Sequence, residues 1–422
     1  MRSLLFFTAV ALAGALGAAP GAAPAATPRI VTIGDVTIDV RYEAIALPAS
    51  NAQFPPAGIA YRDNAVAHHI WRTIHSAAPD LVLTAGPMPS LAKALEGRVP
   101  VVTQLPRRIV PSALARERVR RLGRTPRQFA DELLKVYGRE LKEVAYIPAF
   151  ALMARARLGD KTGVEAIMTP YLNGQQDSLA KPTASHFSGH LIFAELGQVD
   201  RVKAAADLAI AQSSMNNEMS DSVFMGCPLL ARAGQMTGER RYFEAATQHL
   251  AFMQKLCLRP DGLYRHSPLN EAAWGRGNAF AALGMALMIS ALPEGEREKP
   301  AADFRRLADA LLPYQTKNGM WRQVIDDATA YEEFSATAMI AAAIHQAVRE
   351  GWLQGRQYGG AVDRAWEAIK LRTGSDGKLM DVCESTGKQS RMEDYLRRTA
   401  IWDRDPRGGA MALYLAAELL TY

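Results

Sequence analysis

Residues 221–250 read DSVFMGCPLLARAGQMTGERRYFEAATQHL, and this stretch contains one complete unit of the fold. Asp221 stands before an apolar run of helical length, and the pair Thr237-Gly238 follows that run. Asp is favoured at helix starts, and Gly is common just beyond helix ends. A second helical run begins near Glu239. The stretch therefore predicts two helices joined by a tight turn.

The same unit recurs from about Thr125 onward, where helical runs alternate with Gly, Pro and Asp. Twelve helices with short connections predict a mainly α fold over residues 120–422, with six helical hairpins closed into an (α/α)6 toroid. In a toroid the inner helices converge at one end. An open superhelix of helical repeats is the competing architecture. The helical runs begin near Thr125, Lys142, Thr162, Ser185, Gln198, Asp221, Glu239, Ala273, Ala302, Glu333, Ala361 and Asp405.

The first residues carry the features of an export signal. Arg2 gives a basic start, Leu4 to Ala18 is apolar, and Ala23-Pro24-Ala25 supplies the small residues that a signal peptidase needs. The apolar run is shorter than the ~20 residues of a membrane span. We therefore expect a removable signal peptide over residues 1–26, and a mature protein that is periplasmic or secreted and does not enter the membrane.

Residues 27–115 differ from the rest and predict a small N-terminal α/β lobe. Apolar residues alternate between Val31 and Val40 around Gly34-Asp35, a pattern typical of a β-hairpin. Helical spacing predicts a helix over Asn64 to Ala77, and the apolar run Leu81 to Thr84 predicts a buried strand.

Charge and composition narrow the class of partner. The formal net charge of +6 favours an anionic ligand. The basic run Arg116 to Arg127 has no interleaved aromatic residues for stacking bases, so we expect no nucleic acid partner. The sequence carries no signal for a particular oligomeric state.

Cysteine and histidine spacing gives no metal site. The three cysteines are too scattered for a disulfide framework, and we expect buried free thiols, although one disulfide pair is the alternative. The histidines of the predicted lobe helix lack a carboxylate or cysteine to complete a ligand set. We therefore expect no metal and no cofactor. The cysteines are Cys227, Cys257 and Cys383, and the histidines are His68, His69 and His75.

Three loops are dense in side chains that bind sugars. Indole faces stack on pyranose rings, a guanidinium holds a carboxylate through two hydrogen bonds, and amide and imidazole groups bond hydroxyls. Each of these residues also has a structural explanation, as a core ring or a buried ion pair. The candidates are His266, Trp274, Arg276, Asn278, Trp321, Tyr331 and Glu333.

Asp221 has two interpretations that do not exclude each other. A carboxylate at the start of an apolar helix is an ordinary N-cap. If this helix belongs to the inner ring of a toroid, Asp221 also stands at the floor of the pocket, where it can donate or accept a proton.

These motifs resemble the unsaturated glucuronyl and rhamnogalacturonyl hydrolases, glycoside hydrolase families 88 and 105. The resemblance covers about residues 185–422. It rests on residues 221–225, Thr237-Gly238, Gly262-Leu263-Tyr264 with His266, Trp274-Gly275-Arg276-Gly277-Asn278, and Gly319-Met320-Trp321 with Tyr331 and Glu333. The Trp-Gly-Arg-Gly-Asn string is the most specific of these.

The resemblance implies an (α/α)6 barrel and a hydration reaction. The substrate of such enzymes is an acidic oligosaccharide left by a polysaccharide lyase, whose terminal uronic acid carries a C4=C5 double bond. A carboxylic acid protonates C4, water traps the cation at C5, and the hemiketal breaks down and releases the next sugar. By resemblance Asp221 is the acid, while His266, Trp274 and Arg276 bind the unsaturated ring.

The sequence also departs from the family pattern. A second acidic residue is expected in a pattern like Asp-x-x-x-Ser-Gly, where this chain has Ala184, and Ala279-Phe280 replaces a common Gly-Trp. His186 and His190 share one helix face nearby and are predicted as substitute substrate-binding residues.

Two other functions stay open at this point. One is hydrolysis of a saturated glucuronide, with Asp221 partnered by Glu333 or Asp326, which needs two carboxyl groups across the scissile bond. The other is binding of acidic oligosaccharides without catalysis.

Overall fold

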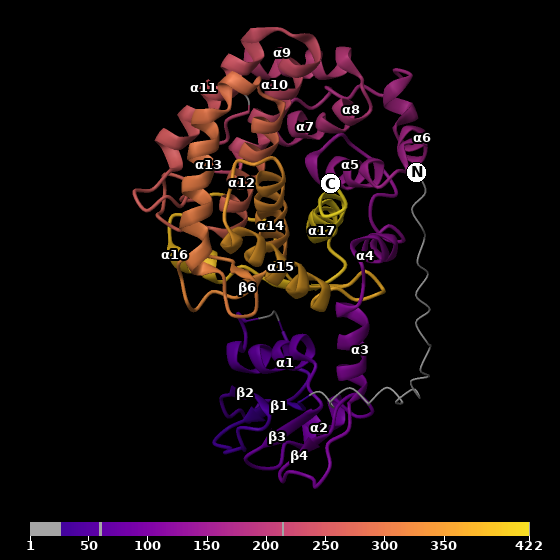
Figure 1. Ribbon diagram of the computed structural model, residues 1–422, viewed down its shortest axis with the longest axis vertical. Coiled ribbons are helices and arrows are strands. Elements are labelled where there is room, and N and C mark those ends of the chain that lie inside the picture. The colour runs from indigo at the N-terminus through magenta and orange to yellow at the C-terminus, as the bar shows by residue number, and fades with distance from the viewer. Residues whose placement is uncertain (1–26, 59–60, 213–214, 422) are drawn as a thin grey trace, which may run out of the picture.

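The computed structural model describes residues 27–58, 61–212 and 215–421. The predicted signal peptide, residues 1–26, lies outside the described residues. Figure 1 shows a small lobe that contains the sheet and, above it, a large ring of helices. Across the described residues, no helix is both long and apolar enough to cross a membrane.

Six inner segments form a closed ring, because each contacts the next and the last contacts the first. This closure decides between the two predicted architectures in favour of the (α/α)6 toroid. In ring order the inner helices are α5 (Tyr146–Arg157), α7 (Ala184–Gly189) continued by α8 (Leu191–Glu195), α10 (Ser222–Thr237), α12 (Gly275–Ala291), α14 (Phe334–Arg349) and α17 (Pro406–Glu418).

The outer helices pack outside this ring and complete the hairpins. They are α4 (Pro126–Leu133), α6 (Lys161–Leu172), α9 (Val199–Gln212), α11 (Arg240–Cys257), α13 (Glu298–Leu311) and α15 (Arg356–Leu371). All twelve predicted helix starts lie within about five residues of an observed start. Thr125 caps α4 through a complete capping box with Gln128, and Gly238 ends α10 with φ +75°, as the sequence predicts.

Burial explains why α12 and α14 occupy the interior. Every residue of α12 except Ser290 is buried, so this helix is apolar all round. Gly284 allows close packing on α10, because a Cβ there would lie 2.7 Å from the backbone of Phe224. The three cysteines are free and buried, which confirms the expectation for them.

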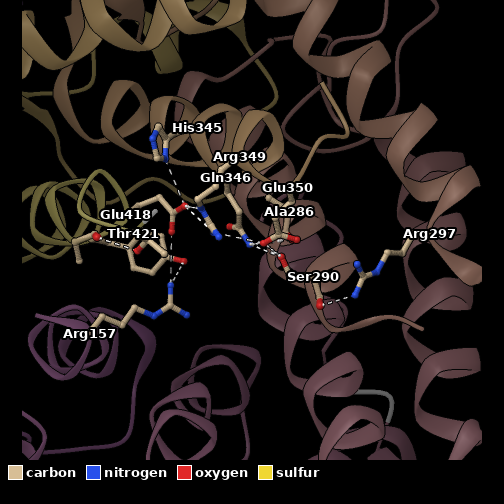
Figure 2. A network of polar contacts seen from close by, with 12 residues as sticks. Arg157, Ala286, Ser290, Arg297, His345, Gln346, Arg349, Glu350, Glu418 and Thr421 are labelled. Atoms are coloured by element: carbon tan, nitrogen blue, oxygen red, sulfur yellow. Dashed lines mark hydrogen bonds and ion pairs between the residues drawn. The ribbon is translucent and has the colours of Figure 1, made fainter. Parts of the chain in front are cut away.

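A polar network joins the C-terminal ends of four inner helices, α5, α12, α14 and α17 (Figure 2). The Glu418 carboxylate accepts a hydrogen bond from Arg349 Nε at 3.0 Å and lies 4.0 Å from Arg157 Nη1. Burial opposes ionisation of Glu418, but His345 and Arg349 hold its pKa below the usual value. Arginines near helix C-termini also interact favourably with the helix dipoles, so the network stabilises this end of the ring.

The lobe contains a parallel sheet in the order β2-β1-β3-β4, covered by helices. The helix and buried strand predicted at Asn64–Ala77 and Leu81–Thr84 are confirmed as α1 and β3. The elements are β1 (Arg29–Ile33), β2 (Glu43–Leu47), α1 (Ala65–Ala77), β3 (Leu81–Thr84), α2 (Pro89–Ala94), β4 (Val101–Val102) and α3 (Ala113–Leu122).

The predicted β-hairpin is wrong. β1 and β2 pair in parallel, with Ile30 opposite Ala44. The apolar residues Val36 and Ile38 belong to the connection, and they pack on one face of the sheet against Ile30 and its neighbours. Their alternation therefore comes from a loop that covers the sheet, and not from a second strand.

The lobe is attached to the ring through buried polar and aromatic contacts. Arg72 of α1 pairs with Asp381 at 3.0 Å, both side chains being nearly inaccessible, and donates a hydrogen bond to Ala400 O at 3.0 Å. Tyr61 stacks on Tyr331 with the ring centroids 5.3 Å apart. The Arg72 contacts join the lobe to a pair of strands, β7 (Leu379–Cys383) and β8 (Ala400–Asp403), and the Tyr61 contact joins it to the residue before Glu332.

The remaining short elements lie in the connections between the helices of the ring. They are the strands β5 (Trp321–Arg322) and β6 (Glu332–Glu333), the helix α16 (Met392–Leu396), and the 3-10 turns at Glu294–Glu296 and Leu312–Tyr314.

Candidate active site

A cavity of about 430 Å³ lies where the N-termini of five inner helices meet. Helix N-termini carry a partial positive charge and free N–H groups, so their convergence favours an anionic ligand. The first residues of these helices, or the residues just before them, line the cavity. They are Tyr146 of α5, Ser185 of α7, Asp221 at the start of α10, Trp274 and Arg276 at the start of α12, and Arg407 of α17.

Asp221 is the acidic group of this cavity. Its side chain makes no capping hydrogen bond to α10. Its Oδ2 atom is buried and has no hydrogen-bond partner among the described residues. A buried carboxylate oxygen without a hydrogen bond is costly, so stability alone does not explain why this side chain is here.

His266 stands directly behind Asp221 and is fully buried. Its Nε2 atom lies 3.3 Å from Asp221 Oδ2, without the geometry of a hydrogen bond. Its Nδ1 atom lies 2.8 Å from the hydroxyl of Tyr395, which itself accepts the backbone N–H of Gln389. The Tyr395 proton is therefore available to Nδ1, and this favours the tautomer whose Nε2–H faces Asp221.

Two tyrosines near the acid stay neutral at neutral pH. Burial raises the pKa of Tyr395 above its usual value, and it raises the pKa of Tyr146 to about 12. Both hydroxyls therefore act as hydrogen-bonding groups and add no negative charge to the cavity.

Trp274 forms a wall beside these groups. Its ring lies 4.4 Å from the imidazole of His266, centroid to centroid, and its Nε1–H is buried without a partner. Ser220, directly before Asp221, has a hydroxyl that is equally without a partner. Ser220, His266 and Trp274 thus each keep a polar atom without a hydrogen bond near Asp221, which is the pattern of a ligand site.

Arg276 lines the cavity, but much of its guanidinium serves the protein itself. Nη1 donates to Cys383 O at 2.7 Å and Nη2 donates to Glu384 O at 2.8 Å. The guanidinium carbon also lies 4.7 Å from the centre of the Trp274 ring. These bonds anchor the loop after β7 and so place Ser385 and Thr386 at the cavity wall.

Arg407 is a site residue that the sequence analysis missed. Its Nε donates to Asp405 Oδ1 at 3.0 Å and its Nη2 donates to Asp405 Oδ2. Asp405 also caps α17 by accepting the backbone N–H of Arg407 at 2.9 Å. Nη1 has no hydrogen-bond partner among the described residues, so it remains free for a ligand. The available clue was an acidic residue, a proline and a basic residue at the start of a predicted inner helix.

Four predicted binding residues are held by the protein and are absent from the described cavity lining. Asn278 bonds the backbone of Tyr264 in both directions, at 2.7 and 2.8 Å, and so fixes the loop before Trp274. Trp321 is fully buried and donates to Leu311 O at 2.8 Å. Tyr331 packs against the lobe. Glu333 caps α14 and accepts the backbone N–H of Cys383 at 2.8 Å.

His186 and His190 also have partners outside the cavity. His186 Nδ1 lies 2.7 Å from Thr183 Oγ1. His190 is fully buried, with Nδ1 2.8 Å from His186 O and Nε2 3.0 Å from Ser178 Oγ. Of this helix it is Ser185, next to Ala184, that reaches the cavity. The position of the missing acid is therefore close to the ligand space and is uncharged.

Among the described residues, the side chains that bind metals do not form a candidate metal site. Within the part of the chain that the structure describes, His, Cys, Asp and Glu side chains do not gather in groups of three or more that could hold a metal ion.

The ring and its cavity define the class of protein: an (α/α)6 toroid whose described cavity lining holds one carboxylate, Asp221, where the inner helices converge. The solved structure of a possible glycoside hydrolase family 105 member from Salmonella enterica has this fold, with a TM-score of 0.61, 19% identity, and coverage of 75% of this chain and 96% of that chain. The model of Glycosyl Hydrolase Family 88 matches residues 206–422, about half of the chain, and the chain belongs to this family.

Two curated relatives each match about half of this chain. An unsaturated rhamnogalacturonyl hydrolase of Bacillus subtilis is 28% identical over 218 residues, which cover 48% of this chain and 59% of the relative. An unsaturated 3S-rhamnoglycuronyl hydrolase of Formosa agariphila is 24% identical over 221 residues, 47% of this chain and 57% of the relative. The chain thus spans less than two thirds of these relatives.

Proposed function

We propose that this protein removes a terminal 4,5-unsaturated uronic acid from an acidic oligosaccharide, with Asp221 as acid and base. The observation that carries the proposal is the buried Oδ2 of Asp221, which has no hydrogen-bond partner among the described residues and faces the His266 ring. The relatives from Bacillus and Formosa are named for unsaturated substrates, which supports the same substrate class.

The reaction requires one carboxyl group and one water. Protonated Asp221 gives its proton to C4 of the double bond, and positive charge develops at C5 and the ring oxygen. Water attacks C5 while the Asp221 carboxylate takes a proton from it, so the acid is regenerated. The product is a hemiketal at C5, whose ring opening and breakdown release the next sugar.

The walls of the cavity fit an anionic sugar. The free Nη1 of Arg407 and the converging helix N-termini supply positive charge for the carboxylate at C5. Trp274 supplies an aromatic wall beside the acid, and its unpaired Nε1–H can donate to a sugar hydroxyl. His266, behind Asp221, holds the carboxylate in position.

The geometry disfavours ordinary hydrolysis between two carboxylates. Glu333 is fully buried and its oxygens accept backbone N–H groups of α14 and of Cys383. Asp326 pairs with Arg259 at 2.8 Å. Neither carboxylate lies among the described residues that line the cavity, so Asp221 has no partner across a scissile bond.

The test is the decay of ultraviolet absorbance of the conjugated double bond when the purified protein meets lyase-generated oligosaccharides. We expect decay with the wild type and a loss of about 100-fold or more in Asp221→Asn, because general acid catalysis contributes about that much. Asp200→Asn, an exposed position in the first turn of α9, is the matched control and should retain the rate.

Other outcomes would redirect the assignment. Unchanged turnover in a folded Asp221→Asn protein would remove Asp221 from its role. Tight binding of the oligosaccharides by wild-type protein, without any decay across the panel, would favour a binding protein over an enzyme.

We also propose that the protein is exported and acts in the periplasm or outside the cell. The basic, apolar and small-residue pattern of residues 1–26 supports this. N-terminal sequencing of the protein from cell fractions tests it: export predicts a new N-terminus near residue 27 outside the cytoplasm, and an intact N-terminus in the cytoplasm would contradict it.

A further inference from the structure

A second cavity, of about 160 Å³, lies between the lobe and the ring. It is far larger than the roughly 10–15 Å³ that one water molecule needs. The lobe contributes residues of α1 and α3, and the ring contributes the end of α15 with residues of β7 and β8. Its described lining shares no residue with that of the catalytic cavity. In Figure 1 this is the region where α3 leads from the lobe towards the ring.

Positive side chains dominate the lining. The acidic residues of the lining are Glu117 and Asp376. Five basic residues face them: Arg98, Arg118, Arg121, Arg372 and Lys378. A confined excess of positive charge costs free energy unless counter-charges compensate it.

Some of these charges are compensated by the protein. Arg121 Nε donates a hydrogen bond to Glu117 at 2.9 Å, but Glu117 also accepts hydrogen bonds from Arg120. The Arg120 hydrogen bonds are the main reason that the pKa of Glu117 is lowered to about 2. Arg372 Nη2 pairs with Glu332. Lys378 is exposed and lies 3.7 Å from Asp403.

Arg98 has no carboxylate partner among the described residues and contacts a neutral ring instead. Its Nη1 lies 3.0 Å from Nε2 of His75, whose Nδ1 lies 2.8 Å from Trp71 O. Burial lowers the pKa of His75 to about 4, with the charges of Arg98 and Arg121 acting in the same direction. His75 therefore accepts a hydrogen bond from Arg98 and neutralises none of its charge.

Arg118 and Arg372 each leave a polar atom unused. Nε of Arg118 is buried without a hydrogen-bond partner, and the described residues offer this side chain no ion pair. Burial lowers the pKa of Arg118; the charge of Arg29 acts in the same direction, and the charges of Glu43, Glu367 and Asp80 oppose it. Arg372 is only 6% exposed, and its Nε is likewise buried and unpaired. Arginines on both sides of the cavity therefore keep hydrogen-bonding capacity that the described residues do not use.

We propose that this cavity binds a small oxyanion, of the size and chemistry of phosphate or sulfate, between Arg98 and Arg118 of the lobe and Arg372 of the ring. A guanidinium presents several N–H groups in a plane, and these match the closely spaced oxygens of an oxyanion. Since the ligand contacts both parts, its binding strengthens the attachment of the lobe to the ring. The site is independent of the catalytic proposal.

The test is thermal unfolding of the full chain with sodium phosphate or sulfate against sodium chloride at matched ionic strength. A ligand of the folded state raises Tm with its concentration, and we expect a rise of about 2–4 °C at a hundredfold excess over Kd. Glucuronate serves as a further arm: a rise with glucuronate but not with phosphate, lost in Arg98→Gln with Arg118→Gln, would assign the site to a sugar carboxylate and overturn the inorganic assignment.

Variants locate the effect. Arg98→Gln with Arg118→Gln should abolish the phosphate-specific rise, and isothermal titration should show the loss of binding to folded protein. Arg116→Gln, an exposed position on the same helix, should keep the rise. Arg407→Gln should also keep it, which excludes the catalytic cavity as the source. Equal stabilisation by chloride, or a rise that persists in the double variant, would overturn the proposal. Should the double variant fail to fold, Arg118→Lys replaces it and is expected to weaken binding at least fivefold.

Discussion

Arg407→Gln tests whether the cavity selects its substrate by charge. Two of the three guanidinium nitrogens of Arg407 donate to Asp405, and Nη1 is left for a ligand. One hydrogen bond between charged groups contributes about 1.5–3 kcal/mol. Since 1.4 kcal/mol corresponds to a factor of ten, kcat/KM on an unsaturated uronide should fall by about 10- to 150-fold.

The assay is the initial rate of absorbance decay over a range of substrate concentrations. Loss of ground-state binding predicts a rise in KM, with kcat changed less. Arg404→Gln is the matched control, because Arg404 is exposed on the same segment and its Nε donates to Asp376 O, away from the cavity.

The variant has one side effect that the design must separate. Removal of the guanidinium leaves the Asp405 carboxylate uncompensated near the cavity, and this charge also repels an anionic substrate. In Arg407→Gln with Asp405→Asn that repulsion is gone, so any remaining loss measures the missing hydrogen bond. A folded Arg407→Gln protein whose kcat/KM stays within twofold of wild type would refute the assignment of Arg407 to the substrate carboxylate.

Three further changes test the structure around the site. Arg72→Met should lower the free energy of unfolding by about 3–5 kcal/mol in urea at pH 7.5, because it leaves buried Asp381 unpaired. Burial raises the pKa of Asp381 to about 6, so its protonation should shrink this deficit at pH 5, and a deficit that does not change with pH would contradict the ionic origin. Gly277→Ala should lower kcat and reduce the free energy of unfolding by about 1–3 kcal/mol, because a Cβ would lie 2.4 Å from Ser220 Oγ. A second change, Ser220→Ala, should restore part of both, and a double variant without any rescue would contradict the clash. Burial lowers the pKa of His190 from 6.5 to about 4, so between pH 6.5 and 4 the unfolded chain takes up a proton that the folded protein does not, and stability falls as the pH falls. His190→Gln should remove about 3 kcal/mol of this acid-induced loss in the free energy of unfolding. A urea unfolding profile with the same pH dependence as wild type would refute the prediction.

The helices of the ring were predictable because their signals are local. Thr125 and Gly238 carry caps whose chemistry depends on a few neighbouring residues, and the observed helices begin and end there. Closure of the ring depends on contacts between helices that are distant in the sequence, so only the structure could decide it. The hairpin prediction failed because Val36 and Ile38 alternate like strand residues while they cover the sheet as a loop.

The site residues were predicted less completely than the helices. Residues such as Asn278 and Glu333 have the right chemistry for sugars, but the backbone uses their hydrogen-bonding atoms. A sequence motif cannot separate these roles, because a residue that builds a pocket wall is spaced like one that touches the ligand. Arg407 was missed for the opposite reason: it stands in no distinctive motif, and only the ring brings it into the same cavity as Asp221.

Three acidic residues begin inner helices, and comparing them supports the proposal that Asp221 is the acid. Glu333 accepts the N–H groups of Ser335 and Ala336 and caps α14, and Asp405 caps α17 while it pairs with Arg407. Their negative charge is therefore balanced within the protein. Asp221 occupies the equivalent place on α10, yet its side chain makes no cap and its Oδ2 has no hydrogen-bond partner in the described part of the chain. A helix cap stabilises by about 1 kcal/mol, so leaving this one unmade has a cost in stability. That cost is understandable if the carboxyl group must exchange a proton with a ligand, because a carboxylate held by two backbone N–H groups could not take one up. The same comparison singles out Asp221 as the candidate acid from geometry, without the motif.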